Sequence, residues 1–146
     1  MRFHMDARKL FVKRLQHLLG IEEDIALLDP RKAGYDLKVG AARVILRFAR
    51  PKSKPHWVKR HSYNYPSCQF NFHRRGRMIG EEVEVAICVI EGTEDFYCLP
   101  WESITSTTFN LHVSAKGREY GGKNAPFRNT IQPLRDAMGE GPIENA

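Results

Sequence analysis

One stretch of sequence decides the expected fold of this chain: Gly34-Tyr35-Asp36-Leu37-Lys38-Val39-Gly40-Ala41-Ala42-Arg43-Val44-Ile45-Leu46-Arg47-Phe48-Ala49-Arg50. It predicts a β-hairpin, with a strand from Tyr35 to Val39, a turn at residues 40–42 and a second strand from Arg43 to Arg50. Successive side chains of a strand point to opposite faces. The second strand is therefore expected to place one set on one face, Val44, Leu46 and Phe48, and another set on the other, Arg43, Ile45 and Arg47.

Before this hairpin, the sequence predicts a helix from Ala7 to Leu19, with Asp6 as its N-cap and Gly20 as its stop. The apolar stripe of the helix consists of Leu10, Phe11, Leu15, Leu18 and Leu19. Its basic residues are expected to lie on the opposite, solvated side: Arg8, Lys9, Lys13 and Arg14.

After the hairpin, alternating apolar residues predict four more strands, at Gln69 to His73, Glu82 to Ile90, Phe96 to Leu99 and Thr108 to Val113. A last short helix is expected from the cap Thr130 to Met138. The order of elements indicates an α+β fold with a mainly antiparallel or mixed sheet between an N-terminal and a short C-terminal helix. The length of 146 residues fits one domain, residues 1–138, followed by a flexible tail over residues 139–146.

The three cysteines, Cys68, Cys88 and Cys98, have no CxxC spacing and fall in expected strands. Buried structural thiols are therefore favoured over a zinc site. Reduced cysteines and the lack of an apolar leader indicate a cytoplasmic protein. No run approaches the ~18 apolar residues that would span a membrane.

Positive charge is the main compositional feature of the chain. Lys and Arg number 23 against 17 Asp and Glu, a formal net charge of +6. The sequence pI is about 9.4. Basic side chains and aromatic residues alternate after the hairpin, which favours contact with nucleic-acid phosphates and bases over an ordinary solvated loop. The residues expected to make this contact are Arg43, Arg50, Lys52, Lys54, Trp57, Lys59, Arg60, Arg74 and Arg75.

The hairpin resembles part of the PD-(D/E)XK, or restriction endonuclease-like, superfamily, and in particular its small intron-encoded homing endonuclease branch. The resemblance rests on Tyr35-Asp36-Leu37, the strand from Arg43 to Arg50, the strand from Val83 to Val89, and Phe96-Tyr97-Cys98-Leu99-Pro100. It implies a restriction endonuclease-like fold. It also implies a Mg²⁺-dependent endonuclease that cleaves phosphodiester bonds of double-stranded DNA, and a homodimer in which two sites reach two strands.

Within this resemblance, Asp36 matches the first metal-binding carboxylate, but the motif is degenerate. Ile45 stands where a Glu or Gln is expected and cannot ligate a metal, and Arg47 replaces the lysine. Arg47 can clamp a phosphate but cannot act as a base. The best substitute for the second carboxylate is Glu84, so the predicted catalytic residues are Asp36, Glu84 and Arg47, with Asp36 and Glu84 as the Mg²⁺ ligands. Glu82 and Glu23 are weaker candidates.

Three alternatives stay open. In the first, the site is inactive, and Arg43, Arg47 and the basic loop only hold phosphate. In the second, Asp36 and Arg47 form only a structural salt bridge across the hairpin. In the third, the chain is a catalytically inactive α+β module that binds another protein. The sequence therefore predicts a DNA-binding protein with a nuclease-like fold and a damaged motif.

Overall fold

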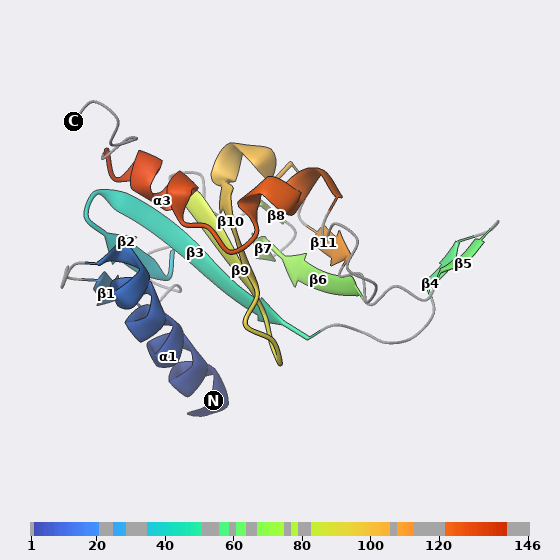
Figure 1. The fold of residues 1–146 in the computed structure, drawn as a ribbon, viewed down its shortest axis with the longest axis horizontal. Coiled ribbons are helices and arrows are strands. Elements are labelled where there is room, and N and C mark those ends of the chain that lie inside the picture. The colour runs from blue at the N-terminus through green and yellow to red at the C-terminus, as the bar shows by residue number, and fades with distance from the viewer. Residues whose placement is uncertain are drawn as a thin grey trace.

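The computed structural model describes residues 2–20, 25–28, 35–50, 56–58, 61–63, 67–74, 77–78, 83–105, 108–112 and 122–139. Its centre is a five-stranded sheet with the order β1-β2-β3-β9-β10 (Figure 1). These strands are β1 (Ile25–Leu27), β2 (Leu37–Val39), β3 (Ala42–Ala49), β9 (Val85–Ile90) and β10 (Phe96–Pro100). Neighbours are antiparallel except β3 and β9, which run parallel. The predicted α+β class with a mixed sheet is confirmed.

The expected hairpin is present as β2 and β3, which pair Leu37 with Val44 and Val39 with Ala42. Gly40 has a φ of 59°, a left-handed conformation that glycine adopts without steric cost and that closes the turn. The first strand is shorter than predicted, because the chain bends at residues 35–36 and regular pairing begins only at Leu37.

Helix α1 (Arg2–Leu19) covers one face of the sheet (Figure 1). The prediction that Asp6 is its N-cap is wrong, because the helix begins at Arg2. The prediction of its end is confirmed: Gly20 has a φ of 73° and its N–H lies 3.2 Å from the carbonyl oxygens of Gln16 and His17. The core on this face joins α1, the sheet and the short helix α3 (Gln132–Ala137) through Phe11, Leu15, Leu19, Val44, Leu46, Val85, Ile87, Cys98 and Leu134.

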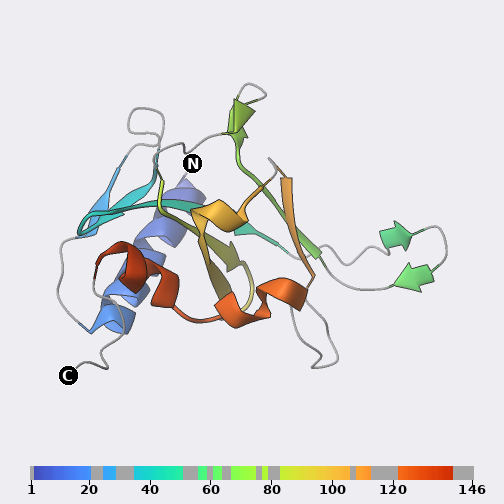
Figure 2. The same cartoon turned by 90° about the horizontal axis from the view of Figure 1, so that it is seen from above.

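The opposite face of the sheet is covered by a two-stranded antiparallel sheet, β6 (Ser67–Asn71) with β11 (Thr108–His112), seen from above in Figure 2. Between the two sheets lies a second core cluster, which contains Ile45, Cys68, Phe70, Phe72, Ala86, Cys88, Tyr97, Leu99 and Leu111. The alternation predicted for β3 is thus confirmed, with Val44 and Leu46 in one core and Ile45 in the other. All three cysteines are free and buried, as expected of structural thiols.

Several element boundaries differ from the prediction. β9 begins at Val85, and Val83 packs with the cluster opposite to that of Val85. The last helix begins at Gln132, whose N–H donates to the Thr130 hydroxyl at 3.2 Å. The chain also contains short elements: β4 (His56–Val58), β5 (His61–Tyr63), β7 (His73–Arg74), β8 (Arg77–Met78), and the 3₁₀ turns η1 (Trp101–Ser103) and η2 (Gly122–Phe127).

The β4–β5 hairpin lies apart from the five-stranded sheet in both views (Figures 1 and 2). Within the part of the chain that the structure describes, no helix is both long and apolar enough to cross a membrane.

Candidate nucleic-acid interface

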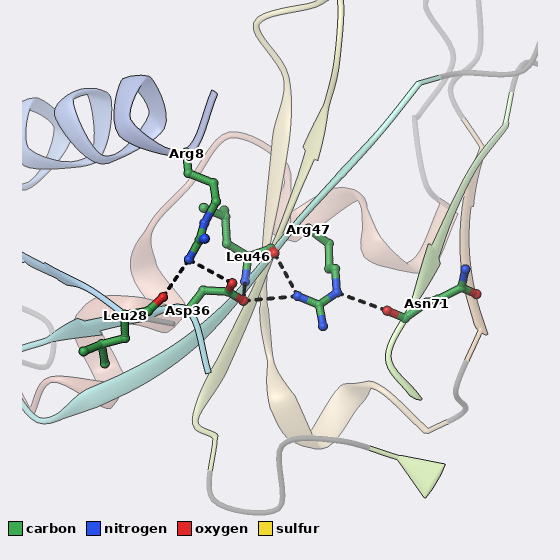
Figure 3. A network of polar contacts seen from close by, with 6 residues as sticks. All are labelled: Arg8, Leu28, Asp36, Leu46, Arg47 and Asn71. Atoms are coloured by element: carbon green, nitrogen blue, oxygen red, sulfur yellow. Dashed lines mark hydrogen bonds and ion pairs between the residues drawn. The ribbon is translucent and has the colours of Figure 1, made fainter. Parts of the chain in front are cut away.

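The carboxylate of Asp36 is the centre of a polar network at the end of β2 (Figure 3). The residue is 3% exposed. Its Oδ1 lies 3.1 Å from Nη2 of Arg8, and its Oδ2 lies 3.1 Å from Nη1 of Arg47. The backbone N–H of Leu46 also donates to Oδ2, at 2.9 Å. One buried carboxylate is therefore shared between two guanidinium groups and one amide.

The strand lengths explain why a carboxylate is needed at this place. β3 continues to Ala49, whereas its ladder with β2 ends at Val44. The next amide on that edge belongs to Leu46, and the Asp36 side chain satisfies it in place of a strand carbonyl. The backbone of Asp36 also ties three strands together, because its N–H donates to Val44 and its carbonyl accepts from Leu28, both at 2.8 Å.

The guanidinium of Arg47 is fixed from several directions. Besides its ion pair with Asp36, its Nη1 donates to the Leu46 carbonyl at 3.0 Å and its Nε donates to the Asn71 carbonyl at 3.2 Å. Its central carbon lies 5.9 Å from the centre of the Phe72 ring. The side chain remains 28% exposed, and among the described residues no partner is found for Nη2. Nε and Nη1 are therefore held, while Nη2 remains available to a ligand.

Arg8 is the functional candidate that the sequence reasoning missed. It was expected on the solvated side of the helix, but its side chain is only 16% exposed, and its Nη2 donates to the Leu28 carbonyl at 3.0 Å as well as to Asp36. The position of Arg8 in the helix indicates that its side chain is buried. Arg8 precedes Phe11, Leu15 and Leu19 at intervals of three, four and four residues, so it lies on the buried stripe. A basic residue within an apolar stripe indicates a buried acidic partner.

Glu84, the predicted second carboxylate, is held by a different arginine. Its Oε1 accepts from the backbone N–H of Arg43 at 2.6 Å and from Nε of Arg43 at 3.2 Å, while Oε2 contacts Nη2 of the same guanidinium. Burial alone would raise the pKa of Glu84, but the hydrogen bonds and charge of Arg43 outweigh it, and the pKa lies below its ordinary value. Glu84 is therefore expected to be ionised at neutral pH.

This lowered pKa gives a testable pH dependence. A carboxyl whose pKa falls on folding stabilises the protein fully above its unfolded pKa, and the contribution is lost as the pH falls towards the folded value. We therefore expect wild type to be more stable than Glu84→Gln at neutral pH, and the difference to shrink as the pH falls below about 4.5, the ordinary value for Glu. Urea unfolding at a series of pH values measures this. A difference that grows in acid would contradict the assignment.

The positions of Asp36 and Glu84 do not fit a shared Mg²⁺ ion. Continued by one residue, the β2–β3 register places Asp36 opposite Ile45, and the β3–β9 register places Glu84 beside Arg43. The two carboxylates therefore lie on opposite sides of β3. The two positions are thus separated by about 7 Å along the strand and about 10 Å across it. A cation bound at Asp36 would also face two guanidinium groups 3.1 Å from the carboxylate oxygens.

The described residues contain no group of three or more His, Cys, Asp or Glu side chains placed to hold a metal ion. The weaker candidates Glu23 and Glu82 lie outside the described residues. The donor set that the structure brings together therefore consists mainly of arginines, and it suits an anion.

The other predicted contact residues are described to different extents. Arg50 is exposed and lies at the rim of a groove of about 610 Å³ between α1 and the turn that joins β9 to β10. Trp57 and Arg74 lie in β4 and β7, for which the backbone alone is described. The remaining predicted contacts lie outside the described residues: Lys52, Lys54, Lys59, Arg60 and Arg75.

Comparison with protein-family models, curated proteins and solved structures finds no match to this chain. Its functional interpretation therefore rests on its own residues, and above all on the arginines that converge on Asp36.

Proposed function

We propose that this protein binds nucleic acid through the arginines of β3 and that double-stranded DNA is its partner. The observation that carries the proposal is the sharing of one carboxylate, Asp36, between two guanidinium groups. Such a cluster keeps an uncompensated positive charge, and Arg47 keeps part of it at the surface. The Nη2 group of Arg47 offers charged N–H donors that suit a phosphate oxygen.

The local charge count supports the same conclusion. Four arginines lie in or beside β3: Arg8, Arg43, Arg47 and Arg50. The carboxylates of Asp36 and Glu84 compensate two of these four positive charges. This local excess of two positive charges is part of the net charge of +6 of the whole chain. The sequence that follows β3 is also rich in Lys and Arg and contains Trp57, a side chain able to stack on a base. Backbone phosphates are the ligand that this excess charge suits.

The salt dependence of binding tests this function. Fluorescence anisotropy with a labelled 20-base-pair duplex in EDTA measures the Kd between 50 and 200 mM salt. Three phosphate contacts would weaken binding by about 40-fold over this range, since each contributes about −0.9 to the logarithmic slope. The charge-reversed variant Lys52→Glu/Lys54→Glu/Lys59→Glu should bind more weakly with a shallower slope. Binding that is absent both in EDTA and in Mg²⁺, or binding indifferent to salt, would favour the alternative in which the chain is a protein-interaction module.

We propose binding without hydrolysis, because Asp36 and Glu84 are each engaged by arginines. Incubation of supercoiled plasmid with the protein should produce no more nicked product in Mg²⁺ than in EDTA. Nicking that requires Mg²⁺ and is abolished in a folded Asp36→Asn variant would contradict this proposal. It would support the endonuclease that the family resemblance implies.

The homodimer implied by the same resemblance stays a prediction. Sedimentation equilibrium, with and without the duplex, measures it independently of nuclease activity.

A further inference from the structure

We propose that Asp36 is a positioning residue: it holds the guanidinium of Arg47 so that Nη2 is a preformed donor to a phosphate oxygen and no divalent cation is needed. This inference rests on the proposed binding of nucleic acid and assigns one site within it. It gives Asp36 a role opposite to that of a metal ligand, because the carboxylate acts on an arginine rather than on a cation.

The hydrogen bonds of Arg47 hold its guanidinium in one position. Asp36 and the Leu46 carbonyl hold Nη1, while the Asn71 carbonyl holds Nε (Figure 3). These acceptors come from the residue that precedes β2, from β3 and from β6, so the guanidinium is fixed between the hairpin and the second sheet. An arginine held in this way has little conformational freedom left to lose when a phosphate binds.

The charges of Arg8 and Asp36 allow a phosphate to bind beside a carboxylate. A carboxylate beside a bound phosphate would normally repel it. Here the Oδ1 atom of Asp36 lies 3.1 Å from Nη2 of Arg8, so that Arg8 compensates the carboxylate while Oδ2 orients Arg47. Together Arg8, Asp36 and Arg47 carry one net positive charge. The buried position of Arg8 on the inner stripe of α1 is explained by this task as well as by packing.

The matched pair Arg47→Lys and Arg135→Lys tests this role directly. Both variants keep the positive charge, but a lysine lacks the planar guanidinium that three acceptors hold while Nη2 stays available. Arg135 lies on α3, outside the residues proposed to contact nucleic acid, so it serves as the control. In EDTA, Arg47→Lys is expected to weaken duplex binding about tenfold and Arg135→Lys by no more than about twofold. Equal effects of the two substitutions would overturn the inference.

Asp36→Asn separates positioning from simple charge counting. Removal of a negative charge near a phosphate should tighten binding if Asp36 acts only through its charge. If Asp36 positions Arg47, the variant should bind more weakly, and the logarithmic salt slope should become shallower by about one phosphate contact. Circular dichroism and urea unfolding establish that the variant is folded under the assay conditions. Tighter binding with an unchanged slope would overturn the inference.

The same experiments distinguish the failure of this inference from the failure of the proposed function. Wild-type protein that does not bind the duplex would defeat both. Wild-type binding that is salt-sensitive but lost in EDTA would leave the function intact and defeat the claim that no divalent cation is needed. Should Asp36→Asn fail to fold, the comparison of Arg47→Lys with Arg135→Lys decides the question alone.

Discussion

Ile45→Glu is expected to unfold the protein rather than to restore a nuclease motif. Ile45 occupies the position at which the resembling family carries a metal-binding Glu or Gln. Here its side chain is 0% exposed and packs between the five-stranded sheet and the β6–β11 sheet. Burial of an unpaired carboxylate costs several kcal/mol even when the group becomes protonated, roughly the whole stability of a small domain, about 5–15 kcal/mol.

The matched control is Ile45→Val, which removes one methyl group and is expected to cost about 1 kcal/mol. Urea unfolding followed by tryptophan fluorescence measures both variants. A folded Ile45→Glu protein with a wild-type midpoint would show that position 45 is accessible to solvent. Burial of position 45 in the core would then no longer explain why the motif lacks a Glu or Gln there.

Asp36→Ala is expected to lower the free energy of unfolding by about 3–5 kcal/mol, the usual cost of removing one partner from a buried charge cluster. The substitution leaves two guanidinium groups, 16% and 28% exposed, without their shared counter-ion. It also leaves the buried N–H of Leu46 without its acceptor. The loss arises mainly from these unpaired groups rather than from the attraction that is removed.

Glu84→Ala provides the control for Asp36→Ala, because both residues are carboxylates paired with arginine. The side chains of Glu84 and Arg43 are each 31% exposed, so solvent screens their interaction. This substitution is expected to cost about 0–1 kcal/mol. Urea unfolding of the two variants in parallel measures the difference. Equal small costs would contradict the view that Asp36 is the buried centre of the network.

The central strands β3 and β9 could be predicted from the sequence as apolar runs bounded by turns, because both lie between the two apolar cores. The β2–β3 hairpin and the β9–β10 hairpin were found near their predicted positions. The short strand β1 was missed, since three residues are too few to show alternation and its conformation depends on pairing with β2. The parallel pairing of β3 with β9 joins distant segments and has no local signal.

The candidate site could be predicted from the sequence only where it depends on local pairing. The salt bridge between Asp36 and Arg47 was one of the alternatives derived from the sequence, and the structure confirms it because the hairpin register brings the two residues together. The pairing of Glu84 with Arg43 depends on the parallel register of β9, which the sequence does not contain in any local pattern. Arg8 could have been recognised from helical spacing alone.

The most direct test of the central claim is a two-dimensional NMR titration that follows the arginine Nε–Hε signals in EDTA while a short DNA duplex is added. The Arg47 signal is assigned by its absence from the spectrum of Arg47→Lys. This signal is expected to shift in step with duplex binding and to shift less in Asp36→Asn, where the carboxylate no longer holds the guanidinium. Saturating binding that leaves the Arg47 signal in place would contradict the claim that Asp36 and Arg47 form a phosphate-binding site.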